Sequence, residues 1–318
     1  MKITLLDAAT LGDDIKDTIF EVFGRFGQVD MRDSTTPGEV ENATLESDIV
    51  VINKVKLGEN LAKAEKLKLI CIAATGYDNV DIDWCRKHNV AVCNVKGYST
   101  QSVAQLTIAM ALTLVNHMRE YCDYVNCGDY TKSGVANRLV PVYHEISGKK
   151  WGIIGVGNIG LEVAKVAEAL GCEVFVNKRN NDTRYPLLDI DTLCKTCDII
   201  SIHTPLTAET RNIINRERIS LMKKEALFIN VARGAVADEE ALAEAIETGK
   251  IGGIGIDVYS KEPMDKEHPF NRILGRPNVC LTPHNAWGSY EARVRCIKIM
   301  GENIESFLIG GSENRVDI

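Results

Sequence analysis

The sequence contains no internal repeat, no low-complexity segment and no apolar run long enough to cross a membrane. Its longest mainly apolar stretch, residues 108–115, is far shorter than the roughly 20 residues that a membrane-spanning helix needs. Basic residues are not in excess, because 37 lysines and arginines stand against 44 aspartates and glutamates, with a formal net charge of −7. We therefore expect neither a nucleic acid nor an anionic membrane as a partner.

A dense cysteine framework is also missing. The ten cysteines are scattered along 318 residues, which is typical of reduced, buried thiols in a cytosolic protein. Cys194 and Cys197 have the spacing of half a metal site, but no second ligand pair follows, so we expect no metal site. The N-terminus reaches Asp7 too early for a signal peptide. These features predict a cytoplasmic protein of about two domains.

The first hundred residues alternate short apolar runs with amphipathic stretches. The apolar runs predict strands, and helical spacing of apolar residues predicts helices between them. Strands are expected at residues 3–6, 49–52, 69–74 and 90–95, and helices at 13–26, 61–67 and 81–88. Because strands that alternate with helices form a parallel sheet with right-handed crossovers, this unit is expected to be small and flavodoxin-like.

A long helix is predicted from residue 99 to about 124, apolar nearly all round in its first half. Its apolar face could bridge two domains or two subunits, or be covered within one subunit. An irregular polar loop is expected over residues 128–147. Six strands and four helices then alternate: strands at 151–154, 174–176, 199–203, 226–231, 251–258 and 279–282, helices at 158–170, 191–197, 216–222 and 238–248. This pattern is typical of a doubly wound dinucleotide-binding sheet, and a last helix over 289–307 is expected to return to the first domain.

We therefore predict an α/β fold with two Rossmann-like domains, in which the dinucleotide-binding domain (residues 99–286) is inserted within the flavodoxin-like one (residues 1–98 and 287–318). The glycine turn at residues 155–160 lies between a predicted strand and a predicted helix. Its first glycine permits a tight turn, its second lets a pyrophosphate approach the backbone, and its third lets helix and strand pack closely. The pyrophosphate would accept hydrogen bonds at the helix N-terminus. The cofactor contacts expected here are Gly155, Gly157, Asn158, Ile159 and Gly160.

Three charged or titratable side chains follow successive strands of the second predicted sheet: Arg233, Glu262 and His284. Because ligands of such a sheet bind outside the carboxyl ends of its strands, we expect the three to converge on one crevice. A guanidinium can grip a carboxylate and a carbonyl oxygen, and an imidazole can give or take a proton near neutral pH. Glu262 would hold the imidazole and favour its protonated form. Each residue alone could be structural, but their shared location favours hydride chemistry at a carbonyl next to a carboxylate.

These residues resemble the D-isomer-specific 2-hydroxyacid dehydrogenase family, and the likeness covers nearly the whole chain in order. The matching segments are 75–81, 97–104, 155–160, 230–234, 257–263 and 282–284. The resemblance implies that Arg233, Glu262 and His284 are catalytic, and that the first domain binds substrate. The other contacts expected are backbone N–H groups of Ala74, Thr75 and Gly76 to the substrate carboxylate, Asp257 to the nicotinamide carboxamide, and Thr100, Thr204, Pro205, Val231 and Ala232 to the cofactor. Trp287 is either core or a wall of the substrate pocket, and we favour the pocket.

Within the family, residues 74–76, 97–100 and 284–287 look most like the bacterial glycerate dehydrogenases, also called hydroxypyruvate reductases. This likeness predicts reduction of a small 2-oxo acid, hydroxypyruvate or glyoxylate, to D-glycerate or glycolate. Two alternatives stay open. One is a D-lactate or phosphoglycerate dehydrogenase-like activity on another 2-oxo acid, and the other is a non-catalytic, nucleotide-sensing binding module. The long apolar helix and the resemblance together suggest a homodimer.

The cofactor prediction turns on the residues after the second strand of the dinucleotide-binding sheet. Family members usually place there an acidic residue that binds the ribose 2′-hydroxyl of NAD, but this chain has Lys178 and Arg179. Two cations can pair with the 2′-phosphate of NADP, so we expect NADP to be favoured over NAD. The alternative is that both cations are solvated and that NAD binds through Asp182 or the backbone.

Overall fold

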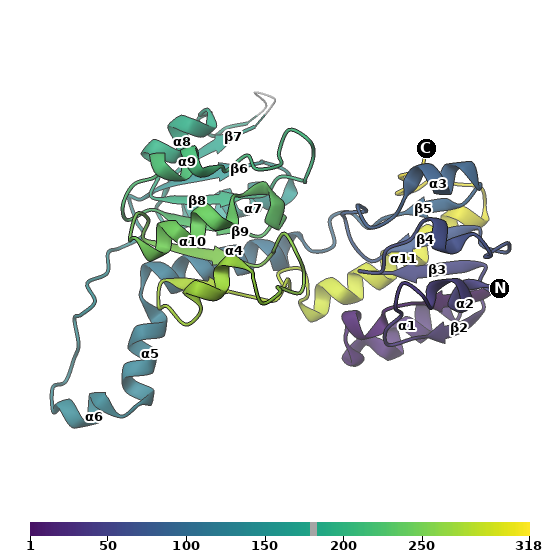
Figure 1. Ribbon diagram of the computed structural model, residues 1–318, viewed down its shortest axis with the longest axis horizontal. Coiled ribbons are helices and arrows are strands. Elements are labelled where there is room, and N and C mark those ends of the chain that lie inside the picture. The colour runs from purple at the N-terminus through teal and green to yellow at the C-terminus, as the bar shows by residue number, and fades with distance from the viewer. Residues whose placement is uncertain (179–182) are drawn as a thin grey trace. The chain divides into compact units, whose positions relative to one another are not determined.

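The computed structural model of the protein describes residues 1–178 and 183–318 (Figure 1). The chain divides into two compact units, one formed by Met1–Ser99 and Gly288–Ile318 and the other by Thr100–Trp287. Each unit has its own parallel sheet flanked by helices. Within the described residues, no helix is long and apolar enough to pass through a bilayer.

The sheet of the first unit has five strands in the order β2-β1-β3-β4-β5, which is the flavodoxin-like order and confirms that prediction. Every residue of the inner strands β3 and β4 is buried, as expected for parallel strands covered on both faces. The strands are β1 (Lys2–Leu5), β2 (Gln28–Met31), β3 (Ile49–Ile52), β4 (Leu69–Ile72) and β5 (Ala91–Cys93), and the helices are α1 (Lys16–Phe23), α2 (Val40–Thr44), α3 (Ile82–Lys87) and α11 (Tyr290–Leu308). The short elements β2 and α2 were absent from the expected set.

The helix predicted over residues 61–67 is wrong. A single 3₁₀ turn, η3 (Glu59–Leu61), is followed by tight turns whose backbone hydrogen bonds join residues three apart, such as Ala64 N to Leu61 O and Leu67 N to Ala64 O. These turns bury Leu61, Ala64 and Leu67, which also have the spacing of an apolar helix face. A period of three is close enough to 3.6 to mislead over so short a stretch.

The second unit has six parallel strands in the order β7-β6-β8-β9-β10-β11, which confirms the predicted doubly wound sheet. A parallel bridge between Val176 and Leu187 adds a short pairing beyond β7. From β6 the chain adds β7 on one side and then returns to add β8 on the other side. The position between β6 and β8 is therefore the switch point at which such sheets bind ligands. The strands are β6 (Lys150–Ile154), β7 (Glu173–Asn177), β8 (Ile199–Ile202), β9 (Leu227–Asn230), β10 (Gly253–Ile256) and β11 (Val279–Leu281), with helices α4 (Thr100–Val115), α7 (Asn158–Ala169), α8 (Ile190–Thr196), α9 (Arg216–Leu221) and α10 (Glu239–Glu247).

The single long helix predicted from residue 99 is also wrong, because it breaks after α4. His117 has the left-handed φ of 50°, and a separate helix α5 (Met118–Asn126) follows it. The apolar face of α4 is covered within its own unit: a Cβ at Gly255 of β10 would lie only 3.0 Å from Met110. The apolar character of α4 is therefore explained without a second subunit.

Beyond the break, α5, α6 (Asp129–Ser133) and the segment up to residue 147 project from the rest of the second unit as an arm (Figure 1). The predicted loop over residues 128–147 thus contains one short helix. All ten cysteines are free, but Cys122 and Cys127 of this arm are exposed, so the expectation of uniformly buried thiols is wrong for these two. The arm has too few neighbours to bury them, since no residue of α5 or α6 is buried.

Candidate active site

The glycine turn joins β6 to α7 at the switch point of the second sheet. Gly155 has a φ of 90°, and a Cβ there would lie 2.7 Å from Thr204 Cγ2 and 2.9 Å from the carbonyl carbon of His203. A Cβ at Gly160 would lie 2.1 Å from the carbonyl oxygen of Gly155. Both glycines are therefore required by the packing of the protein itself, the first for its backbone conformation and the third for the approach of α7 to β6.

Gly157 differs from the other two glycines. Its φ of −82° is open to any residue, and a Cβ there would meet no atom of the described residues within 4 Å. Gly157 is the N-cap residue of α7, and because it has no side chain it makes no capping hydrogen bond to the first N–H groups of the helix. An anion at these N-terminal N–H groups could accept hydrogen bonds from them, and the pyrophosphate contact expected here stays a prediction.

Polar atoms at the neighbouring strand end support the same site. Among the described residues, the buried atoms His203 Nδ1 and Thr204 Oγ1 have no hydrogen-bond partner, directly after β8. Buried polar atoms without partners are rare, and a bound ligand commonly supplies the missing bond. Burial lowers the pKa of His203 to about 3, so its ring is neutral in the folded protein. Of the predicted 2′-phosphate contacts, Lys178 directly follows β7, whereas Arg179 and the alternative Asp182 lie outside the described residues.

The structure brings Glu262 and His284 together. His284 Nδ1 lies 2.6 Å from Glu262 Oε2, and the other carboxylate oxygen accepts a hydrogen bond of 2.9 Å from the backbone N–H of Tyr259. The His284 backbone has a φ of 52°, and its carbonyl accepts from the indole Nε1 of Trp287 at 3.0 Å. With Nδ1 facing the carboxylate, the proton that the ring can exchange with a ligand is the one at Nε2.

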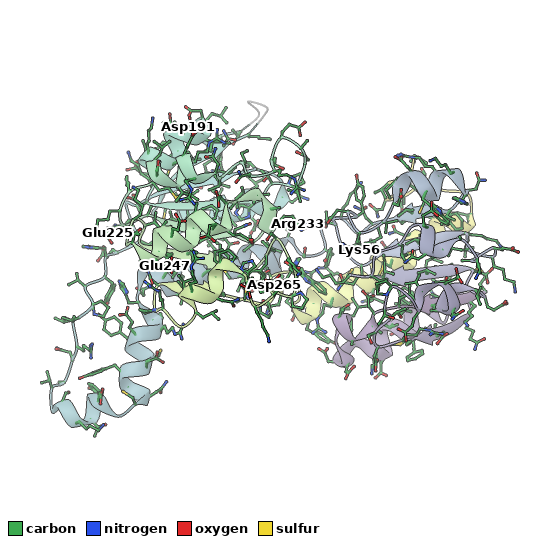
Figure 2. All side chains as sticks on the ribbon, viewed as in Figure 1. Lys56, Asp191, Glu225, Arg233, Glu247 and Asp265 are labelled. Carbon is green, nitrogen blue, oxygen red and sulfur yellow. The ribbon has the colours of Figure 1, made fainter. Side chains whose placement is uncertain are left out.

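Arg233, which is labelled in Figure 2, lies three residues beyond β9 in a turn. The buried side chain of Asn230 closes this turn, since its Nδ2 donates to Arg233 O at 2.8 Å and its Oδ1 accepts from Ala232 N at 3.0 Å. A Cβ at Gly234 would lie 2.0 Å from the carbonyl carbon of Tyr259. The turn that carries Arg233 and the expected contacts Val231 and Ala232 is thus packed directly against the loop that leads to Glu262.

Asp257 has no exposed surface, and the pKa of its carboxyl is raised because burial outweighs the hydrogen bonds that it accepts. Those bonds come from Thr282 Oγ1 at 2.6 Å and from the backbone N–H groups of Asn285 and Ala286 at 2.9 and 3.0 Å. All three donors flank His284. Asp257 therefore fixes the segment that carries His284, and its contact with the carboxamide stays a prediction.

The remaining predicted residues lie at the ends of elements. Thr100 is the first residue of α4, and Pro205 follows Thr204 after β8. In the first unit, the segment Ala74–Gly76 follows β4, where Thr75 Oγ1 donates to Val95 O at 2.8 Å and Asn94 Nδ2 donates to Thr75 O at 2.7 Å. These bonds hold the segment by its side chain and carbonyl, and its N–H groups donate to no backbone carbonyl of the described residues.

Sequence reasoning missed three residues that shape the site: Asn230, Tyr259 and Thr282. Each lies inside or beside a recognised segment, but each acts through a side chain or backbone bond to a residue distant along the chain or across a turn. The only available signal was a polar residue, Asn230, at the end of an otherwise apolar strand, where burial demands a hydrogen-bond partner.

Known proteins resemble the chain along its whole length. The sequence profile of the D-isomer specific 2-hydroxyacid dehydrogenase NAD binding domain matches residues 108–286. A glycerate dehydrogenase of Methylorubrum extorquens is 33% identical over 317 residues, which cover 99% of each chain. A hydroxypyruvate reductase of Blautia hydrogenotrophica is 32% identical over 326 residues, with 100% of each chain covered.

Solved structures agree with the sequence relatives. An acyclic imino acid reductase in complex with NADPH and D-Arg has a TM-score of 0.86 and 30% identity, covering 99% of this chain and 100% of that one. A D-lactate dehydrogenase from Aquifex aeolicus, complexed with NAD and lactic acid, has a TM-score of 0.87 and 28% identity, covering 100% and 99%. The chain therefore belongs to the D-isomer specific 2-hydroxyacid dehydrogenase family, and it is an oxidoreductase that uses a nicotinamide cofactor.

Proposed function

We propose that the protein reduces a small 2-oxo acid, hydroxypyruvate or glyoxylate, to the corresponding D-2-hydroxy acid or glycolate. The observation that carries the proposal is the 2.6 Å contact between His284 and Glu262 beyond the carboxyl ends of a sheet that also presents the glycine turn and Arg233. The names of the glycerate dehydrogenase and hydroxypyruvate reductase relatives support this choice of substrate.

Each side chain has a role in this proposal. Arg233 binds the substrate carboxylate and carbonyl oxygen through its planar guanidinium. His284 donates the Nε2 proton to the carbonyl oxygen as the carbonyl carbon is reduced, and Glu262 stabilises the positive charge of the imidazolium before that transfer. When bound, the nicotinamide supplies the hydride from C4.

We also propose that NADP is favoured over NAD. Lys178 directly follows β7, where an acidic residue would otherwise bind the ribose 2′-hydroxyl, and a cation there suits a 2′-phosphate. A structural relative bound to NADPH and another bound to NAD support the view that this fold accepts either nucleotide. Parallel kinetics with NADPH and NADH test the preference, and equal or better efficiency with NADH would contradict it.

The proposed working unit is a homodimer, with the arm of the second unit as its contact. The arm exposes apolar side chains that a single chain leaves in water: Val125, Val135, Leu139, Val140, Val142 and Tyr143, each at least 50% exposed. Clusters of exposed apolar residues on a projecting segment are typical of association surfaces. Sedimentation at micromolar concentration should give twice the chain mass, and replacing Leu139 and Val142 by serine should give the monomer.

A substrate panel tests the proposed activity most directly. Hydroxypyruvate, glyoxylate, pyruvate and 3-phosphohydroxypyruvate should be offered with NADPH and with NADH, and cofactor oxidation followed by absorbance. We expect the highest kcat/KM for hydroxypyruvate or glyoxylate. Complete inertness toward all four acids, with nucleotide binding intact, would instead favour the non-catalytic binding module.

A further inference from the structure

The segment Tyr259–Glu262 follows β10 and links the parts of the proposed active site. Its first residue donates to Glu262, and Glu262 in turn holds His284. On another side, the same backbone contacts the Arg233 turn, because a Cβ at Gly234 would lie 2.1 Å from Ser260 N. Whatever fixes the peptide between Tyr259 and Ser260 therefore fixes the position of Glu262.

That peptide is held by Glu239, the first residue of α10. Glu239 Oε1 accepts from Ser260 N at 2.8 Å, and Glu239 Oε2 accepts from the hydroxyl of the same serine. Both oxygens of one carboxylate thus bind one residue, which is a two-point contact that fixes orientation as well as distance. Tyr259 is fixed from its other end, since its hydroxyl donates to Thr282 O at 2.9 Å.

The buried side chain of His268 lies next to the Glu239 carboxylate. The side chains of Glu239 and His268 are 10% and 4% exposed, and His268 Nε2 lies 3.2 Å from Glu239 Oε2. His268 Nδ1 accepts from Phe270 N, so the ring carries its proton at Nε2, on the side of Glu239. Burying a carboxylate is costly unless it accepts hydrogen bonds, and here both oxygens accept one from Ser260.

A helix N-terminus alone does not explain this burial. An acidic residue in the first turn of a helix is favourable without being buried, as the exposed neighbour Glu240 illustrates, and Asp238 already caps α10 through Ala241 N. Glu239 is instead turned away from solvent and bound to Ser260. We propose that Glu239 is a positioning residue, which holds the Tyr259–Glu262 segment in the conformation that presents Glu262 to His284.

This inference rests on the proposed function, because it acts through Glu262. The test is Glu239→Gln, which keeps the size of the side chain but removes one acceptor, with Glu247→Gln as matched control. Glu247, which is labelled in Figure 2, lies at the other end of the same helix. It pairs with Arg272 on the surface. With hydroxypyruvate and NADPH, Glu239→Gln should lower kcat about ten- to hundredfold. The KM for hydroxypyruvate and the Kd for NADPH should stay within about threefold, and Glu247→Gln should match the wild type.

A double-mutant cycle separates positioning from general stability. If Glu239 acts through Glu262, then Glu239→Gln should change kcat by less than about twofold in a Glu262→Gln background. Equal losses in both backgrounds, or an unchanged kcat in the single variant, would overturn the inference. Should Glu239→Gln fail to fold, Ser260→Ala removes only the hydroxyl donor, and the same cycle with Glu262→Gln applies. If His284→Ala and Glu262→Gln turn over like the wild type, the proposed function itself fails, which is a distinguishable result.

Discussion

Two alanine substitutions in the glycine turn should have opposite effects on folding and on cofactor binding. At Gly160 an added Cβ would lie 2.1 Å from the carbonyl oxygen of Gly155, roughly 1 Å closer than an ordinary C···O contact. Helix α7 must therefore shift away from β6, and overpacking of this kind costs about 1–3 kcal/mol. Gly160→Ala should thus lower the free energy of unfolding of the protein without any nucleotide present.

At Gly157 the same substitution meets no atom of residues 1–178 and 183–318 within 4 Å, and the φ of −82° suits alanine. We expect the free energy of unfolding to change by less than about 1 kcal/mol. The added methyl group would occupy the space proposed for the pyrophosphate and disturb one or two charge-assisted hydrogen bonds, each worth about 1.5–3 kcal/mol. The Kd for NADPH should therefore rise at least about tenfold.

The assay combines thermal unfolding without nucleotide and fluorescence titration with NADPH and NADH for both variants. Gly157→Ala should melt like the wild type and bind nucleotide weakly, whereas Gly160→Ala should melt earlier. Wild-type affinity for both nucleotides in Gly157→Ala would refute the location of the pyrophosphate at the N-terminus of α7.

Further predictions concern proton transfer, cofactor choice and pH. His284→Ala should lower kcat with hydroxypyruvate by about 10²–10⁴-fold while the Kd for NADPH is retained, as steady-state kinetics and titration would measure. Lys178→Ser should raise the KM for NADPH about tenfold and leave that for NADH nearly unchanged. The pKa of His203 falls from 6.5 to about 3 on folding, so the unfolded chain binds a proton in that window that the folded chain does not. Stability is therefore lost as pH falls below 6.5. Between pH 7 and pH 5, the free energy of unfolding of His203→Asn should fall by about 2 kcal/mol less than that of the wild type, as urea unfolding would measure.

The strands and the glycine turn were predictable because they depend on local patterns. Fully buried parallel strands such as β3 and β8 are continuous apolar runs, and the turn at residues 155–160 has its own glycine spacing. Prediction failed where tertiary contacts override the pattern. No glycine or proline at the break near His117 indicates that the helix ends there. The edge strand β2 is partly exposed and polar, so it lacks the apolar run that predicts a strand.

The site was predictable in its parts but not in its connections. Arg233, Glu262 and His284 each follow a strand, so their shared location could be derived from the rule for strand ends. Nothing in the sequence indicates that Asp257 binds the residues beside His284, or that Glu239 binds Ser260. Such contacts join elements through buried polar groups, and only the packed chain defines their partners.

The proposed reaction is tested most directly by following one deuterium atom. Hydroxypyruvate should be reduced with NADPH that carries deuterium at the transferred C4 position, and the product analysed by mass spectrometry and chiral chromatography. We predict D-glycerate with deuterium at C2, and at least about a hundredfold less of it from His284→Ala in the same time at the same enzyme concentration. Unlabelled glycerate, the L isomer, or equal product from the variant would contradict it.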